Sequence, residues 1–122
     1  MQQTVYPAQK LVGEVQVPGY LDGAARALSL AVLSTEESLI DNVPPQIDAL
    51  AVFWRRLGVQ IERQKSRLKV QGPGLKNFVP VEDILDAEVL GEEIIPLVAL
   101  LAVQAFPTRL KVDMELERCR QL

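Results

Sequence analysis

The sequence predicts an α/β (α+β) protein in which a mixed β-sheet packs against buried apolar helices. Three observations support this. Residues 11–17 alternate in polarity and lead through Pro18-Gly19 into residues 21–33, which are apolar nearly all round. Alternation is typical of a half-buried strand, and a helix that is apolar all round has to be buried on several sides. Residues 59–71 have the pattern of a β-hairpin, and residues 94–105 that of a second, strongly apolar helix.

The remaining elements of the first half follow from capping and turn residues. Asp22 is the predicted N-cap of the first helix, which continues to about Leu33. Residues 38–43 are expected to form a strand. Pro45 suits the first turn of an amphipathic second helix, and Gly58 supplies its stop.

The chain is predicted to be one domain, 1–122, made of a βαβαββ unit at 1–72 and a partial second unit at 73–122. Apart from its apolar helix, the second unit is expected to hold short strands at 87–90 and 108–113. Its charged end is expected to form a turn or a short helix.

Composition narrows the function classes. The chain has 122 residues, a net charge of -3, no histidine and a single cysteine, Cys119. The mild acidity argues against a nucleic-acid or anionic-membrane surface, and the missing histidine removes the commonest metal ligand. We therefore predict no metal, no cofactor, no nucleic-acid partner and no membrane. The amino terminus does not resemble a signal peptide, so the predicted location is cytoplasmic.

Several local motifs occur together in order. They are Gly-Glu-Val-x-Val-Pro-Gly at 13–19, Asn42-Val43-Pro44, Leu57-Gly58-Val59 before the hairpin, Glu93-Ile94-Ile95-Pro96, and Glu115-Leu116. In this arrangement the chain resembles the enolpyruvyl transferase family, most closely its 3-phosphoshikimate 1-carboxyvinyltransferase (EPSP synthase) branch. The match covers almost the whole chain but only part of such an enzyme.

The resemblance implies an EPSP-synthase-like fold, in which two domains are each built from three βαβαββ units around buried helices. It also implies a metal-free reaction in the cleft between the domains. There the enolpyruvyl group of phosphoenolpyruvate is transferred to a hydroxyl of shikimate 3-phosphate.

In the register that fits best, the chain resembles the carboxy-terminal half of the family enzyme. The family's phosphate-binding corner carries an Asp and two serines, where this chain has Tyr20, Asp22 and Gly23. Glu93 stands at the place of the Asp regarded as the general base. Near the chain's end, Glu117 and then Cys119-Arg120 stand where the family has Arg and a Lys-Glu pair.

A register on the amino-terminal half stays open. It aligns Arg26 with a substrate-binding arginine of the family, but it puts Leu21 in place of an essential lysine. In either register the fold positions are kept and most of the chemical groups are lost.

The resemblance leaves two weak site candidates. Glu93 is a candidate general base, although an acid in the first turn of a helix is the plainer interpretation. Arg26 is a candidate residue for binding an anion. The competing interpretation is that it forms an ordinary surface salt bridge.

A basic side of the second helix and hairpin is a candidate surface for an acidic protein partner. The competing interpretation is a charged, solvated face. The candidate residues of the protein-binding surface are Arg55, Arg56, Arg63 and Arg67.

The sequence therefore predicts an EPSP-synthase-like domain that lacks most catalytic residues and acts as a binding or assembly module. Its partner would be a protein, either a second copy or another polypeptide. The alternative is a fragment or subunit of a genuine transferase of the shikimate pathway, and only then would it bind a phosphorylated small molecule. A purely structural homo-oligomer is the third possibility, because so few units leave apolar helix surfaces exposed.

Overall fold

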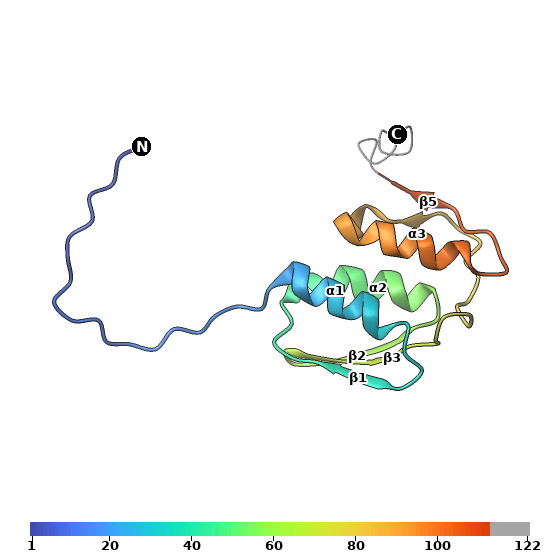
Figure 1. The fold of residues 1–122 in the computed structure, drawn as a ribbon, viewed down its shortest axis with the longest axis horizontal. Coiled ribbons are helices and arrows are strands. Elements are labelled where there is room, and N and C mark those ends of the chain that lie inside the picture. The colour runs from blue at the N-terminus through green and yellow to red at the C-terminus, as the bar shows by residue number, and fades with distance from the viewer. Residues whose placement is uncertain (113–122) are drawn as a thin grey trace.

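The computed structural model describes residues 1–112, and Figure 1 shows their fold. The first group of elements is α1 (Leu21–Ala31), β1 (Glu37–Ile40), the 3₁₀ turn η1 (Pro45–Ile47), α2 (Asp48–Arg56), β2 (Gln60–Gln64) and β3 (Arg67–Gln71). The second group is β4 (Leu85–Asp86), the 3₁₀ segment η2 (Glu88–Glu93), α3 (Ile94–Ala102) and β5 (Leu110–Lys111).

The elements are stacked in layers. A three-stranded sheet of order β1-β3-β2 lies at one end, with β3 antiparallel to both neighbours. Helices α1 and α2 cover one face of this sheet, and α3 lies above them (Figure 1). β4 and β5 form a small parallel pair beyond α3. The α/β class expected from the sequence, with a sheet packed against apolar helices, is confirmed.

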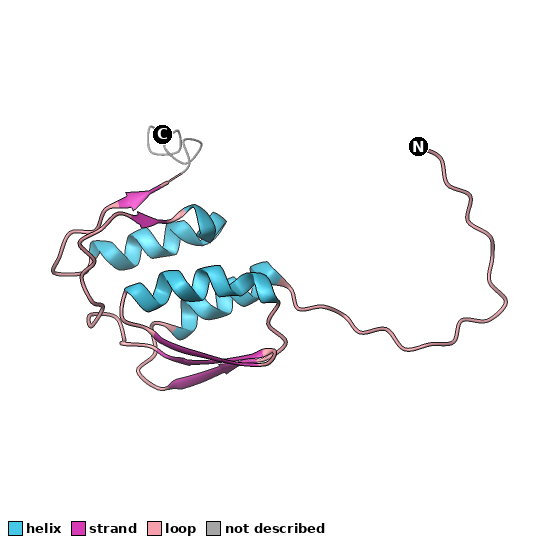
Figure 2. Ribbon diagram, turned by 180° about the vertical axis from the view of Figure 1, so that it is seen from behind, coloured by secondary structure: helices cyan, strands magenta, loops and turns pink. Residues whose placement is uncertain are grey.

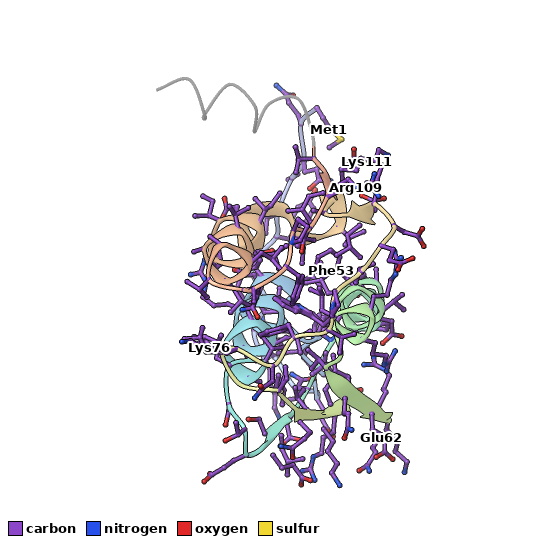
Figure 3. The ribbon with its side chains drawn as sticks, turned by 90° about the vertical axis from the view of Figure 1, so that its right-hand side faces the viewer. Met1, Phe53, Glu62, Lys76, Arg109 and Lys111 are labelled. Carbon is purple, nitrogen blue, oxygen red and sulfur yellow. The ribbon has the colours of Figure 1, made fainter. Side chains whose placement is uncertain are left out.

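The core runs continuously through these layers. Its largest fully buried side chains come from all of them: Leu28, Val32, Ile47, Trp54, Leu57, Leu68, Val70, Leu85 and Leu97. Phe53 lies in the middle of the molecule, whereas Glu62 lies on the outer side of the sheet (Figure 3). Burial of each leucine contributes about 2 kcal/mol, so this continuous core is the main source of stability.

The predicted strand at residues 11–17 is wrong for the structure described here. Residues 1–20 form no helix or strand, and the chain runs away from the body as an extended arm (Figure 2). A strand satisfies its backbone N–H and C=O groups on a neighbour, and within residues 1–112 no neighbour pairs with this arm. The polarity pattern describes a strand that has no partner here.

The first helix also differs from its prediction. Tyr20, in an extended conformation, occupies the N-cap position, and Asp22 already lies inside the first turn. The helix ends at Ala31 rather than near Leu33. It is not buried all round, since Leu30 is 65% exposed.

The hairpin and the second helix follow the prediction more closely. β2 and β3 pair from Gln60–Gln71 to Gln64–Arg67, with Lys65 in the left-handed region (φ 56°) at the turn. The helix stop at Gly58 has φ +93°. Strand β1 ends earlier than expected because Asn42 also adopts a left-handed conformation (φ 54°).

In the second half, the strand predicted at 87–90 is wrong. Residues 88–90 belong to η2, Ala87 is its N-cap, and the short strand β4 comes just before it. α3 ends at Ala102, three residues earlier than expected, and the last predicted strand is reduced to β5. The predicted turn or helix at the charged end lies outside the described residues. The division into a complete and a partial unit stays a prediction.

Across residues 1–112, every helix is too short or too polar to cross a membrane.

Candidate functional site

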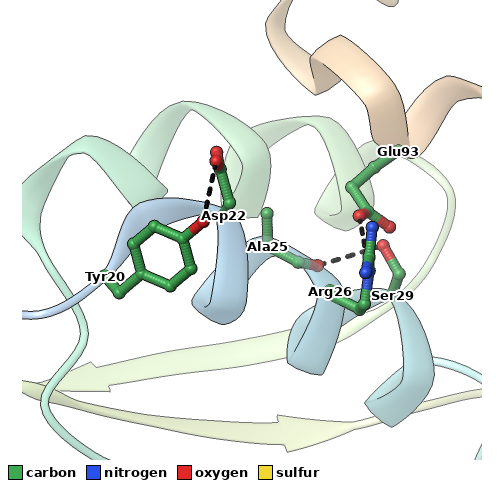
Figure 4. A network of polar contacts seen from close by, with 6 residues as sticks. All are labelled: Tyr20, Asp22, Ala25, Arg26, Ser29 and Glu93. Atoms are coloured by element: carbon green, nitrogen blue, oxygen red, sulfur yellow. Dashed lines mark hydrogen bonds and ion pairs between the residues drawn. The ribbon is translucent and has the colours of Figure 1, made fainter.

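The corner that opens α1 is a polar turn without a free anion site. The hydroxyl of Tyr20 donates a hydrogen bond of 3.2 Å to Oδ2 of Asp22 (Figure 4). Asp22 lies in the first helical turn, where its carboxylate interacts favourably with the positive end of the helix dipole. A negative charge in this place repels a phosphate group.

The two site candidates, Arg26 and Glu93, contact each other. Arg26 lies one turn into α1, and Glu93 lies at the junction of η2 and α3, 67 residues away. Nε of Arg26 donates to Oε1 of Glu93 at 3.3 Å (Figure 4). The Glu93 side chain is 8% exposed, whereas the Arg26 side chain is 70% exposed. The buried carboxylate is thus balanced by a cation at the surface.

A groove of about 470 Å³ runs between α1 and α3, beside this ion pair. Ser29 lies on the same side of α1, and its hydroxyl donates to the carbonyl oxygen of Ala25 at 3.1 Å. The groove is almost entirely apolar. Its lining residues are Arg26, Ser29, Leu30, Leu33, Trp54, Leu75, Glu93, Pro96, Leu97, Ala99, Leu100 and Val103.

The groove has few polar groups with which to perform chemistry. Among residues 1–112, Arg26 and Glu93 are the only charged residues that line it, and they neutralise each other. The indole Nε1 of Trp54 is buried and has no hydrogen-bond partner within residues 1–112. An arrangement of this kind suits an apolar occupant better than a dianionic one.

Two arginines of the predicted basic side lie at the end of α2 and bind to other segments of the chain. Nε and Nη2 of Arg55 both donate to the carbonyl oxygen of Ile61, at 3.0 and 2.9 Å. Arg56 forms an exposed ion pair of 3.5 Å with Asp83. Both side chains therefore connect α2 to neighbouring segments of the same chain.

The other two arginines of this side are likewise paired inside the fold. Nη1 of Arg63 lies 3.5 Å from Oδ1 of Asp48. Arg67 forms an ion pair with Asp41, and the hydrogen bond to this carboxylate, aided by its charge, raises the pKa of Arg67. Nearby, a hydrogen bond to Glu37 raises the pKa of Lys69. The protein-binding role of these arginines stays a prediction.

No three carboxylate or thiol groups converge as metal ligands in the part of the chain that the structure describes. The sequence missed the groove itself. Leu30, Leu33 and Leu75 line it. The signal for it was the apolar character of residues 21–33 on every side, from which we predicted either burial or an exposed apolar helix surface, but no groove between two helices.

The model of the EPSP synthase (3-phosphoshikimate 1-carboxyvinyltransferase) family matches residues 5–118. The 3-phosphoshikimate 1-carboxyvinyltransferase of Geobacter sulfurreducens is 30% identical over 115 residues, which are 93% of this chain and 27% of the relative. That of Alkalilimnicola ehrlichii is 35% identical over 121 residues, with 97% and 27% covered.

Another carboxyvinyltransferase is similar over a shorter stretch. The UDP-N-acetylglucosamine 1-carboxyvinyltransferase 3 of Caldanaerobacter subterraneus is 36% identical over 76 residues, 61% of this chain and 18% of the relative.

Among solved structures, EPSP synthase from Acinetobacter baumannii superposes with a TM-score of 0.70 at 22% identity, covering 83% of this chain and 24% of that one. The similarity to this structure supports the fold alone. This chain spans about a quarter of the length of the curated 3-phosphoshikimate 1-carboxyvinyltransferases that it matches. It belongs to the EPSP synthase (3-phosphoshikimate 1-carboxyvinyltransferase) family.

Proposed function

We propose that this chain is a module of the EPSP synthase fold that binds another polypeptide and has no transferase activity of its own. The observation that carries the proposal is the Arg26–Glu93 ion pair beside an apolar groove. The two side chains with possible roles in transfer chemistry are bound to each other, and the surface beside them is apolar.

The state of Glu93 supports this proposal. A general base has to reach the proton that it removes, and its carboxylate has to be free to accept it. Glu93 is buried, and its Oε1 already accepts a hydrogen bond from Arg26.

The start of α1 supports it as well. A helix N-terminus binds phosphate through free N–H groups and positive charge. Here the carboxylate of Asp22 occupies the first turn, and the hydroxyl of Tyr20 is bound to it.

The surfaces of α1 and α3 support a polypeptide partner. Leu30 on α1, Leu33 in the turn just after it and Val103 at the C-cap of α3 line the groove, and each is substantially exposed. Burying one such side chain contributes roughly 1.5–3 kcal/mol. A partner with an apolar helix face could therefore bind here without any charged contact.

The test is a transferase assay of the purified chain with shikimate 3-phosphate and phosphoenolpyruvate. We expect no product, and no change in melting temperature with either compound at millimolar concentration. Turnover by the chain alone would contradict the proposal.

A second candidate is a part of a genuine transferase that needs the rest of the enzyme, which would place the chain in aromatic amino acid biosynthesis. Its support is the high coverage of this chain, 93–97%, against only 27% of each relative. Mixing the chain with a Geobacter sulfurreducens relative that lacks the matching quarter tests it. Restored turnover that is lost in Arg26→Met would favour this candidate, and no turnover would favour the first.

A further inference from the structure

The ion pair between Arg26 and Glu93 uses only part of the hydrogen-bonding capacity of both groups. Its one contact joins Nε of Arg26 to Oε1 of Glu93 at 3.3 Å. This is longer than the roughly 2.7–2.9 Å of a strong charge-assisted hydrogen bond. Within residues 1–112, the Nη groups of Arg26 and Oε2 of Glu93 form no hydrogen bond. Both side chains can therefore bind a further molecule without leaving each other.

The two partly used groups carry opposite charges on the wall of the same groove. Arg26 and Glu93 both line it, and Figure 4 shows their side chains meeting beside Ser29. Most of the Arg26 side chain is in water, whereas the Glu93 side chain is 8% exposed. A molecule that enters the groove thus meets a cation at its rim and a carboxylate further inside.

Ser29 adds a neutral acceptor next to this pair. It follows Arg26 by three residues, so both lie on the same side of α1, and it also lines the groove. Its hydroxyl proton is donated to the carbonyl oxygen of Ala25 at 3.1 Å. The lone pairs of Oγ therefore remain available to an incoming donor.

The rest of the groove suits an apolar body. Leu30, Leu97 and Leu100 contribute to its walls. Its volume of about 470 Å³ lies within the roughly 300–1,000 Å³ that is typical of sites for small molecules. A dianion would be repelled by Glu93. An amine or an acid with a single charge would leave one group of the ion pair unmatched. A zwitterion with an apolar side chain matches both charges and the apolar walls.

We propose that this groove binds a free α-amino acid with an apolar side chain. The ammonium group donates to Oε2 of Glu93 and Oγ of Ser29, and the carboxylate accepts from the Nη groups of Arg26. The side chain lies between α1 and α3. Because the ion pair and the zwitterion are each neutral overall, binding buries no uncompensated charge. This site goes beyond the polypeptide-binding role proposed above, and the amino acid competes with the polypeptide for the groove.

Trp54 provides the signal for a binding experiment. It is the only tryptophan of the chain, and it lines the groove. L-Leucine is a suitable probe because it does not absorb the light that excites tryptophan. We expect leucine at millimolar concentration to change the emission of Trp54 saturably, and to shift the amide NMR signals of Leu30 and Leu97. If neither signal changes, the proposal is wrong.

Compounds that lack one part of leucine test the three contacts separately. Isoamylamine lacks the carboxylate, isocaproate lacks the ammonium group, and glycine lacks the apolar body. Each should bind at least roughly tenfold more weakly than leucine, because a charge-assisted hydrogen bond or apolar burial is lost. Binding of isoamylamine or isocaproate as tight as that of leucine would overturn the proposal, since one charge would then be sufficient.

Two variants connect the binding to the ion pair. Arg26→Met removes the partner of the carboxylate, so it should weaken leucine binding at least roughly tenfold and abolish the advantage of leucine over isoamylamine. Arg56→Met, which removes an ion pair that does not line the groove, is the matched control and should bind leucine as the wild type does. Circular dichroism checks that both variants are folded. Unchanged leucine binding in Arg26→Met would contradict the inference.

This experiment and the test of the proposed function can fail separately. The leucine titration uses the chain alone and requires no polypeptide partner, and the transferase assay contains no amino acid. Absence of leucine binding would therefore refute the amino-acid site only, and turnover by the chain would refute the proposed function only.

Discussion

Glu93 illustrates how a single residue is stabilised by a contact that is distant in sequence. Its carboxylate is buried at the start of α3, and burial of an unpaired charge is costly. Arg26 offsets this cost from α1 while most of its own side chain remains in water. The pair therefore couples the two halves of the chain.

We expect Arg26→Met to lower the free energy of unfolding by about 1–2 kcal/mol, measured by urea denaturation. This is less than for a fully buried pair, because water can reach the arginine. Arg56→Met, which removes an ion pair exposed on both sides, is the control and should cost under about 0.5 kcal/mol. If the double variant Arg26→Met with Glu93→Met shows no coupling, the pair does not contribute to stability.

Lys69 gives a prediction about pH. The hydrogen bond to Glu37, then its charge and that of Glu62, raise the pKa of Lys69 above its ordinary value of 10.5. The folded state therefore keeps this proton more tightly than the unfolded state. The stabilisation is complete below pH 10.5 and is lost as pH rises through the raised pKa. In an NMR titration, Glu37→Gln should lower the pKa of Lys69 toward 10.5, whereas Glu36→Gln should leave it unchanged. No shift in Glu37→Gln would contradict the assignment.

At the scale of elements, the turn after α1 and the end of β3 pack closely, backbone against backbone. A Cβ on Gly72 would lie 2.4 Å from the carbonyl oxygens of Val32 and Ser34. These are backbone atoms, which cannot rotate away as a side chain would. Glycine at 72 is thus needed for α1 to lie on the sheet.

Gly72→Ala should lower the free energy of unfolding by about 2–4 kcal/mol, as the backbone has to separate. Gly23→Ala is the matched control inside α1, where a Cβ meets only the ring of the exposed Tyr20, at 2.9 Å. Because alanine favours helix more than glycine, this variant should gain about 0.5–1 kcal/mol. Thermal and urea unfolding measure both. Equal effects at the two positions would show that backbone contact at Gly72 is not limiting.

Across the whole molecule, stability is expected to be uneven between the two sheets. In the three-stranded sheet the central strand β3 is paired on both sides, and Leu68 and Val70 are fully buried. The parallel pair β4–β5 has only two residues in each strand. Two backbone hydrogen bonds of 2.9 Å hold it together, from the amides of Leu85 and Ala87 to the carbonyl oxygens of Arg109 and Lys111 respectively.

Native-state hydrogen exchange should therefore distinguish the two sheets. We expect the amides of Leu68 and Val70 to exchange only through global unfolding, and those of Leu85 and Ala87 to exchange at least roughly tenfold faster through local opening. Equal protection in both sheets would mean that the molecule opens as a single unit.

The sequence by itself determined the elements whose signals are local. The hairpin was predictable because its alternation and its turn lie within 13 residues, Val59 to Gln71. The family and fold class were predictable from short motifs around these elements. Helix α1 was predictable as an element, but its cap at Tyr20 was not, because Asp22 is the better capping residue by type.

Only the tertiary structure decided which surfaces are covered. It joined Arg26 to Glu93, which each looked like a possible ligand site or base when considered alone. It left residues 11–17 unpaired, because a strand depends on a neighbouring edge that no local pattern specifies. It also exposed Leu30 beside a groove, because burial depends on what packs against a helix and not on how apolar the helix is.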